Sequence, residues 1–107
     1  MESIIKGPYK ALLVEDDRIM RTVIREMLDH SGLKMEIIEA ETGAAAKDIL
    51  SQNRFDFVLL DYELPDTNAL ELLKTFHEIF NRRVPIIILT NYNSIDLATA
   101  VMAAGAI

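Results

Sequence analysis

Apolar residues follow two alternating patterns along this chain. Short runs of consecutive apolar residues alternate with longer segments in which apolar residues recur every three or four positions. The first pattern is typical of strands buried on both faces of a parallel sheet, and the second of helices with one buried side. The sequence therefore predicts strands and helices in strict alternation. The predicted strands cover residues 10–14, 34–39, 55–60 and 84–89, and the predicted helices cover 18–30, 43–52, 68–80 and 94–104.

Capping residues set the limits of these helices. Asp17 and Thr42 each stand where a helix needs an N-cap, and Gly32 and Gly105 suit the left-handed residue that often follows a helix. Two apolar stripes are expected to face the core. They are Ile19, Val23, Ile24, Met27 and Leu28 on the first helix, and Leu70, Leu73, Phe76, His77 and Phe80 on the third.

The order of the elements predicts a single α/β domain with a doubly wound parallel sheet. Short, right-handed connections place the helices on both faces of such a sheet. Residues 34–39 alternate only in part, which suits an edge strand, whereas residues 55–60 suit a central one. Residues 1–9 are expected to form a tail, and residues 10–107 the domain.

Composition narrows the class of protein further. The net charge of −6 argues against direct nucleic-acid binding by this segment, because nucleic-acid modules are normally basic. The chain has no cysteine, so it has neither a disulfide framework nor a thiolate metal site. No apolar run reaches the length of a membrane span, and the N-terminus lacks the core of a signal peptide. We therefore expect a cytoplasmic domain that does not contact a membrane.

Polar residues with recognisable chemistry follow three of the predicted strands. Glu15 and Asp16 come after residues 10–14, Asp61 after 55–60 and Thr90 after 84–89. Right-handed winding brings these strand ends to one edge of the sheet, where ligands collect in such folds. An acidic run alone is usually a solvated turn or a helix cap, but its match with Asp61 and Thr90 favours a site.

The residue types in this cluster point to a divalent cation and to phosphoryl chemistry. Carboxylates held close together repel one another unless a cation neutralises them, and oxygen ligands without cysteine or histidine favour Mg²⁺, with Mn²⁺ as an alternative. The Asp61 carboxylate is a competent nucleophile for forming an aspartyl phosphate. The Thr90 hydroxyl is a donor for a phosphoryl oxygen.

Three segments carry a resemblance that spans nearly the whole chain. They are LLVEDDRIMR, FDFVLLDYELPDTNALELL and VPIIILTNYNSIDLATAVMAAGA. The chain resembles the receiver domain of two-component response regulators. The resemblance implies a flavodoxin-like fold with strand order 2-1-3-4-5, and transfer of a phosphoryl group from a histidine kinase or histidine phosphotransfer protein to Asp61. It also implies Mg²⁺ bound by Asp16, by Asp61 and by the backbone carbonyl of Glu63, with Glu15 acting mostly through water, and Thr90 as the switch residue.

The chain departs from the family pattern at three places. Asn68-Ala69 replaces the usual Asp-Gly, and Asn91 replaces the small residue that usually follows the switch hydroxyl. The sequence also stops at Ile107, before the fifth strand and its lysine, so the order expected here is 2-1-3-4 without the fifth strand and helix. We expect the strand at residues 84–89 to be an exposed apolar edge that favours a homodimer, element exchange or low stability. The favoured explanation is a segment cut from a longer protein.

The predicted function is a phosphoacceptor that switches a protein-binding surface and turns over no outside substrate, so it is not an enzyme in the usual sense. Two alternatives stay open. One is an interaction module that dimerises whether or not it is phosphorylated. The other is a small hydrolase using the same aspartyl chemistry, for which Asp66 is the nearest downstream acid.

Overall fold

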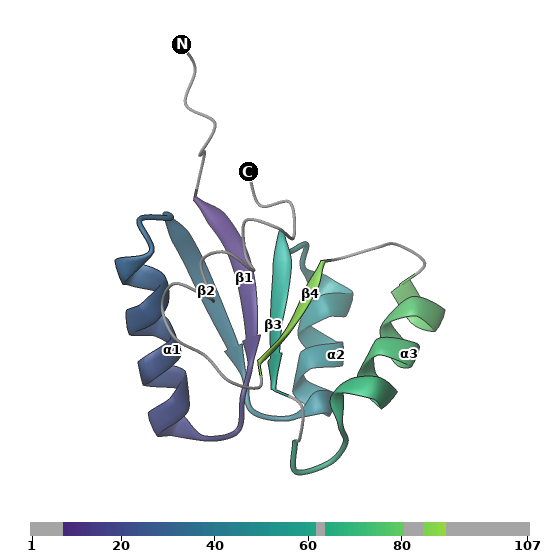
Figure 1. Cartoon of the computed structure of the whole chain (residues 1–107). Coiled ribbons are helices and arrows are strands. Elements are labelled where there is room, and N and C mark those ends of the chain that lie inside the picture. Colours follow the sequence, from purple (N-terminus) through teal and green to yellow (C-terminus); the bar gives the residue numbers. More distant parts are fainter. Residues whose placement is uncertain (1–7, 62–63, 81–84, 90–107) are drawn as a thin grey trace.

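The computed structural model describes residues 8–61, 64–80 and 85–89 of the chain. Strands and helices alternate along these residues, as the hydrophobic pattern predicts (Figure 1). The strands are β1 (Tyr9–Val14), β2 (Met35–Ala40), β3 (Phe57–Asp61) and β4 (Ile86–Leu89), and the helices are α1 (Arg18–His30), α2 (Gly43–Gln52) and α3 (Ala69–Phe80). The helix predicted at residues 94–104, with Gly105, lies outside the described residues.

The strands form one parallel, four-stranded sheet in the order β2-β1-β3-β4. Every residue of β1 from Ala11 to Val14 is buried, and so is every residue of β3 from Phe57 to Leu60. Strand β2 ends the sheet on one side and is only partly buried, which confirms the prediction of an edge strand. The two acidic strand ends therefore belong to the two most deeply buried strands.

Helices cover both faces of the sheet, so the fold is doubly wound as predicted (Figure 1). Alternate residues along each central strand point to opposite faces, and each set packs with different helices. On the face covered by α1, the buried cluster includes Leu13, Leu59, Ile24 and Leu28. On the face covered by α2 and α3, it includes Leu12, Leu60, Leu50 and Leu72.

The predicted caps Asp17 and Thr42 and the left-handed Gly32 are confirmed. The Asp17 carboxylate accepts a hydrogen bond from the backbone N–H of Ile19 at 2.8 Å, and it also accepts one from Met20. The Thr42 hydroxyl oxygen accepts from the backbone N–H of Ala45 at 3.0 Å. Gly32 follows α1 with φ of 85°, a left-handed conformation that glycine adopts at little cost. These local signals place both helix starts within one residue of the prediction.

The predicted limits of β3 need correction. The strand begins at Phe57, not at Phe55. Just before it, the backbone N–H of Asp56 donates to the carbonyl of Lys10, and the Lys10 N–H donates to the Asp56 carboxylate instead of to a backbone carbonyl. These bonds tie the residue before β3 to the start of β1. At the other end, Asp61 still belongs to the ladder and pairs with Leu89 of β4. The backbone of Asp61 is thus held by the sheet itself.

Two residues assigned to the buried stripes are instead exposed. Ile19 is 73% exposed and Leu70 is 55% exposed, so their predicted burial was wrong. Both lie in the first turn of a helix, at positions on the exposed side of that turn. In α3 the buried positions are Ala69 and Leu72, one residue out of phase with the prediction. The side chains of Phe76, His77 and Phe80 lie outside the described residues.

The difference in burial between Leu59 in the core and Ile19 on the surface predicts that shortening these two side chains will destabilise the fold unequally. Leu59→Ala should lower the free energy of unfolding by about 2–5 kcal/mol, because it leaves a cavity between β3 and α1. Ile19→Ala should change it by less than about 0.5 kcal/mol, because Ile19 packs little surface. Urea unfolding followed by circular dichroism measures both. Equal destabilisation by the two substitutions would contradict the packing described here.

Candidate metal site

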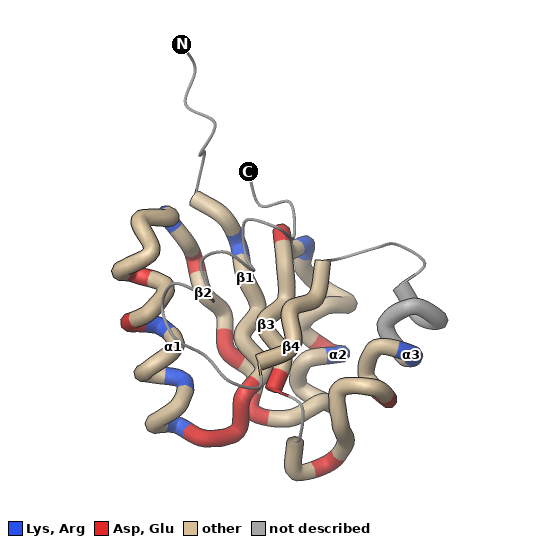
Figure 2. The backbone as a smooth tube through the Cα atoms, in the orientation of Figure 1, with Lys and Arg blue, Asp and Glu red and all other residues tan. Residues whose placement is uncertain are grey.

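Three carboxylates meet at the carboxyl edge of the sheet. Glu15, Asp16 and Asp61 each offer one oxygen, and these oxygens all lie within 4.8 Å of one another. The register explains their meeting, because Val14 of β1 pairs with Leu60 of β3 and the acids follow directly. In Figure 2, the red of the turn between β1 and α1 and the red at the end of β3 lie at the same edge of the sheet. The predicted acidic cluster is therefore present.

The three acids differ in exposure. Glu15 is only 3% exposed, Asp61 is half-buried and Asp16 is exposed. The cluster thus has a buried floor at Glu15 and an open side at Asp16, through which an ion from solvent can enter. Hard oxygen donors of this kind suit a divalent cation such as Mg²⁺.

Burial and crowding change the protonation of Glu15. The pKa of its carboxyl group is raised from 4.5 to about 7. The largest cause is removal from water, and the negative charge of Asp61 and the neighbouring Asp16 side chain contribute to the same rise. A hydrogen bond of 3.1 Å from the Asp17 backbone N–H to Glu15 Oε2 opposes this rise. Without a cation, the cluster keeps a proton on Glu15 up to near-neutral pH.

The sequence interpretation missed one residue that contacts this site. Arg21 of α1 is buried, and its guanidinium group donates to the backbone carbonyls of Glu15 and Asp16. The signal was present, since Arg21 shares the buried side of α1 with Ile24 and Leu28. A charged residue in an apolar stripe implies a paired, buried guanidinium, but the sequence alone does not show its partners.

Asp66, the acid considered for the hydrolase alternative, has a structural role. Its two carboxylate oxygens accept hydrogen bonds from the first backbone amides of α2, at Gly43 and Ala44, at 2.8 and 3.0 Å. These bonds hold the pKa of Asp66 below its usual range. A Cβ on Gly43 would lie 2.4 Å from Thr67 Cγ2, so glycine permits this close approach. The carboxylate that the hydrolase alternative requires thus caps the N-terminus of α2.

Two predicted site residues, Glu63 and Thr90, lie outside the described residues, as does Asn91.

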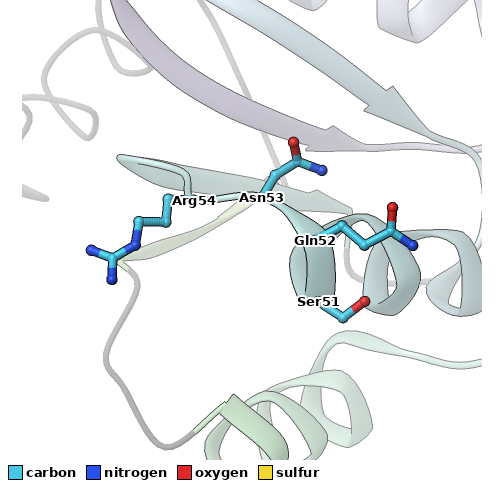
Figure 3. A pocket seen from close by; sticks show the side chains of 4 residues that line it. All are labelled: Ser51, Gln52, Asn53 and Arg54. Carbon is cyan, nitrogen blue, oxygen red and sulfur yellow. The ribbon is translucent and has the colours of Figure 1, made fainter.

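Elsewhere, a shallow hollow of about 270 Å³ is lined by Ser51, Gln52, Asn53 and Arg54, between α2 and β3. Figure 3 shows that these four side chains point apart instead of converging. The hollow lies at the end of α2 that leads into β3, away from the acids that follow β1 and β3.

Comparison with known proteins identifies the family. The sequence profile of the response regulator receiver domain matches residues 11–107. The chain belongs to the response regulator receiver family. Receiver domains are signalling modules of two-component systems, and the doubly wound sheet of this one has their flavodoxin-like arrangement. The recognition made from sequence is therefore confirmed.

Individual relatives agree with this assignment. The receiver domain is 33% identical over 99 residues to the response regulator MprA of Mycobacterium sp. (strain KMS); the match covers 92% of this chain but 42% of that protein. It also resembles the magnesium-bound receiver domain of the sensor histidine kinase PA1611 from Pseudomonas aeruginosa PAO1. There the TM-score is 0.80 and identity 23%, over 91% of this chain and 97% of the other. The Mn²⁺-bound response regulator Rcp1 gives a TM-score of 0.69 and 28% identity, over 92% and 76% of the two chains.

One further structural finding concerns membranes. Among the residues that the structure describes in this receiver domain, no helix combines the length and the apolar character that crossing a bilayer requires.

The raised pKa of Glu15 predicts how the metal-free receiver domain responds to pH. The folded chain holds the Glu15 proton up to about pH 7, whereas the unfolded chain releases it near 4.5. The free energy of unfolding attributable to Glu15 should therefore fall as pH rises through this interval. Thermal unfolding in EDTA should show Glu15→Gln gaining stability relative to the unmodified chain as pH rises from 4.5 to 7. A difference that does not vary with pH would contradict the assigned shift.

Proposed function

We propose that this chain is the phosphoacceptor of a two-component phosphorelay. In this proposal Asp61 receives a phosphoryl group from a phosphohistidine of a histidine kinase or histidine phosphotransfer protein, with Mg²⁺ as the cofactor. The observation that carries the proposal is the meeting of Glu15, Asp16 and Asp61 at one edge of the sheet. The chain spans only 42% of the length of relatives such as MprA. We therefore include in the proposal that phosphorylation switches a protein-binding surface, whose partner would be a further domain or another protein.

The donor set of the acidic cluster fits Mg²⁺. It consists of carboxylate oxygens alone, which are hard ligands, and its open side at Asp16 leaves room for the waters that Mg²⁺ retains. Similar structures with Mg²⁺ and with Mn²⁺ support both ions as candidates. Glu15, Asp16, Asp61 and the backbone carbonyl of Glu63 would hold the cation. When bound, the cation would neutralise charge on the carboxylates and on an approaching phosphoryl group.

The position of Asp61 suits nucleophilic attack. Its backbone is fixed in the ladder opposite Leu89, while its side chain is half-buried beside Asp16. A carboxylate oxygen would attack phosphorus in line with the bond to the histidine nitrogen. The new bond joins oxygen and phosphorus, the phosphorus–nitrogen bond breaks, and its electron pair stays on the imidazole, which takes up a proton from solvent. Positioning and charge neutralisation supply most of the catalysis in such transfers.

In this proposal, Thr90 is the residue that responds to phosphorylation of Asp61. Its hydroxyl group would donate a hydrogen bond to a phosphoryl oxygen on Asp61 and so shift the surface that follows β4. Thr90 comes directly after Leu89, the residue that pairs with Asp61, and this proximity along the chain supports the assignment. The step resembles other switches in which an added phosphoryl group biases a two-state segment.

Phosphorylation of Asp61 is directly testable. Incubation with a small acyl phosphate and Mg²⁺ should add the mass of one phosphoryl group, as seen by intact-mass spectrometry. EDTA should prevent the addition, and Asp61→Asn should abolish it. Asp56→Asn is the matched control, because Asp56 lies just before β3, at the opposite end from Asp61, and contacts Lys10 instead of the cluster.

The proposal fails if the unmodified chain gains no phosphoryl group while it still binds Mg²⁺. It also fails if the adduct survives in Asp61→Asn, because another residue would then be the acceptor. An adduct that forms equally in EDTA would refute the role of the cation.

A further inference from the structure

Arg21 is a buried cation beside the acidic cluster. Its side chain is 10% exposed, and it lies on the side of α1 that packs on the sheet. Burying a guanidinium group is costly unless its donors are paired, so the contacts of Arg21 must offset that cost. Those contacts run in two directions, toward the acidic turn and toward β2.

Toward the acidic turn, one nitrogen of Arg21 bridges two consecutive carbonyls. Its Nη1 atom donates to the carbonyl oxygen of Glu15 at 2.8 Å and to that of Asp16 at 3.1 Å. The side chains of these two residues supply two of the three clustered carboxylates. Both carbonyls belong to the short backbone segment that carries the Glu15 and Asp16 side chains.

Toward β2, the same guanidinium group is anchored by two acids. Its Nε atom donates to Glu39 Oε1 and its Nη2 atom to Glu41 Oε1, both at 3.0 Å. Glu39 also pairs with Arg25. The backbone N–H of Glu15 donates to the carbonyl of Ala40 at 3.0 Å, so the turn is tied to the end of β2 by the backbone as well. The arginine thus links the acidic turn to the edge strand.

We propose that Arg21 is a positioning residue that holds the turn between β1 and α1 in its cation-binding conformation. The inference rests on the proposed function, since it concerns the same cation site. The contribution is geometric: a planar fork can donate to carbonyls on one side and carboxylates on the other at once. Charge alone would act in the opposite direction, because a nearby positive charge weakens the binding of a cation.

This opposition of geometry and charge gives a sharp test. Arg21→Met removes the fork and the charge but keeps an unbranched apolar stem. If Arg21 acted only through its charge, the variant would bind Mn²⁺ more tightly. If it positions the turn, the variant should bind Mn²⁺ about tenfold or more weakly, the usual cost of losing a residue that orients metal ligands. Electron paramagnetic resonance of free Mn²⁺ during titration measures the dissociation constant.

Arg25→Met is the matched control. Arg25 lies one turn further along α1 and pairs with Glu39 and with the carbonyl of Ile37, but it makes none of the hydrogen bonds to the carbonyls of Glu15 and Asp16. Arg25→Met removes the same positive charge and one of the two arginines that pair with Glu39. The dissociation constant for Mn²⁺ should therefore stay equal or fall slightly. Amide hydrogen exchange in metal-free protein should be faster at Asp17 in Arg21→Met, but not in Arg25→Met.

Arg21→Lys keeps the test decisive if Arg21→Met does not fold. A lysine ammonium group can reach one set of partners but not both, so the dissociation constant should still rise measurably. Unchanged Mn²⁺ affinity in Arg21→Met, or in Arg21→Lys if only that variant folds, overturns the inference while leaving the proposed function intact. An unmodified chain that binds no Mn²⁺ overturns the proposed function and the inference together.

Discussion

The parallel pairing of β1 with β3 is the constraint on which the rest of this structure depends. Both strands are buried along most of their length, and their register places Val14 opposite Leu60. The acids that follow must then lie together at one edge, despite the repulsion among carboxylates. That repulsion and the burial of Glu15 are offset by a proton in the absence of metal. A divalent cation can take the place of that proton.

Loops at this edge are held by contacts from outside the cluster. Arg21 fastens the turn after β1 to the end of β2, and Asp66 fastens the loop after β3 to the start of α2. Both anchors use hydrogen bonds to backbone groups, which fix a loop's path without occupying the site. Glycine at position 43 allows the second loop to approach closely. Each of these contacts thus ties a segment that follows a central strand to a neighbouring element.

Local signals in the sequence predicted much of this arrangement. The caps Asp17 and Thr42 and the apolar runs placed most elements, because these features act over a few residues. The exposure of Ile19 was not predictable from periodicity, which shows which side of a helix is apolar but not which residues of that side the assembled fold covers. The bonds from Arg21 to Glu39 and Glu41 join residues 18 and 20 positions apart, and such pairings depend on the assembled fold.

The central claim is that the clustered carboxylates hold a divalent cation. Nuclear magnetic resonance with small additions of Mn²⁺ locates the ion directly, because the paramagnetic ion broadens the signals of nearby amides. The account predicts broadening centred on the amides of Asp16 and Asp61. Broadening centred instead on Glu39 and Glu41 near the end of β2, or spread evenly over exposed acids, would contradict it.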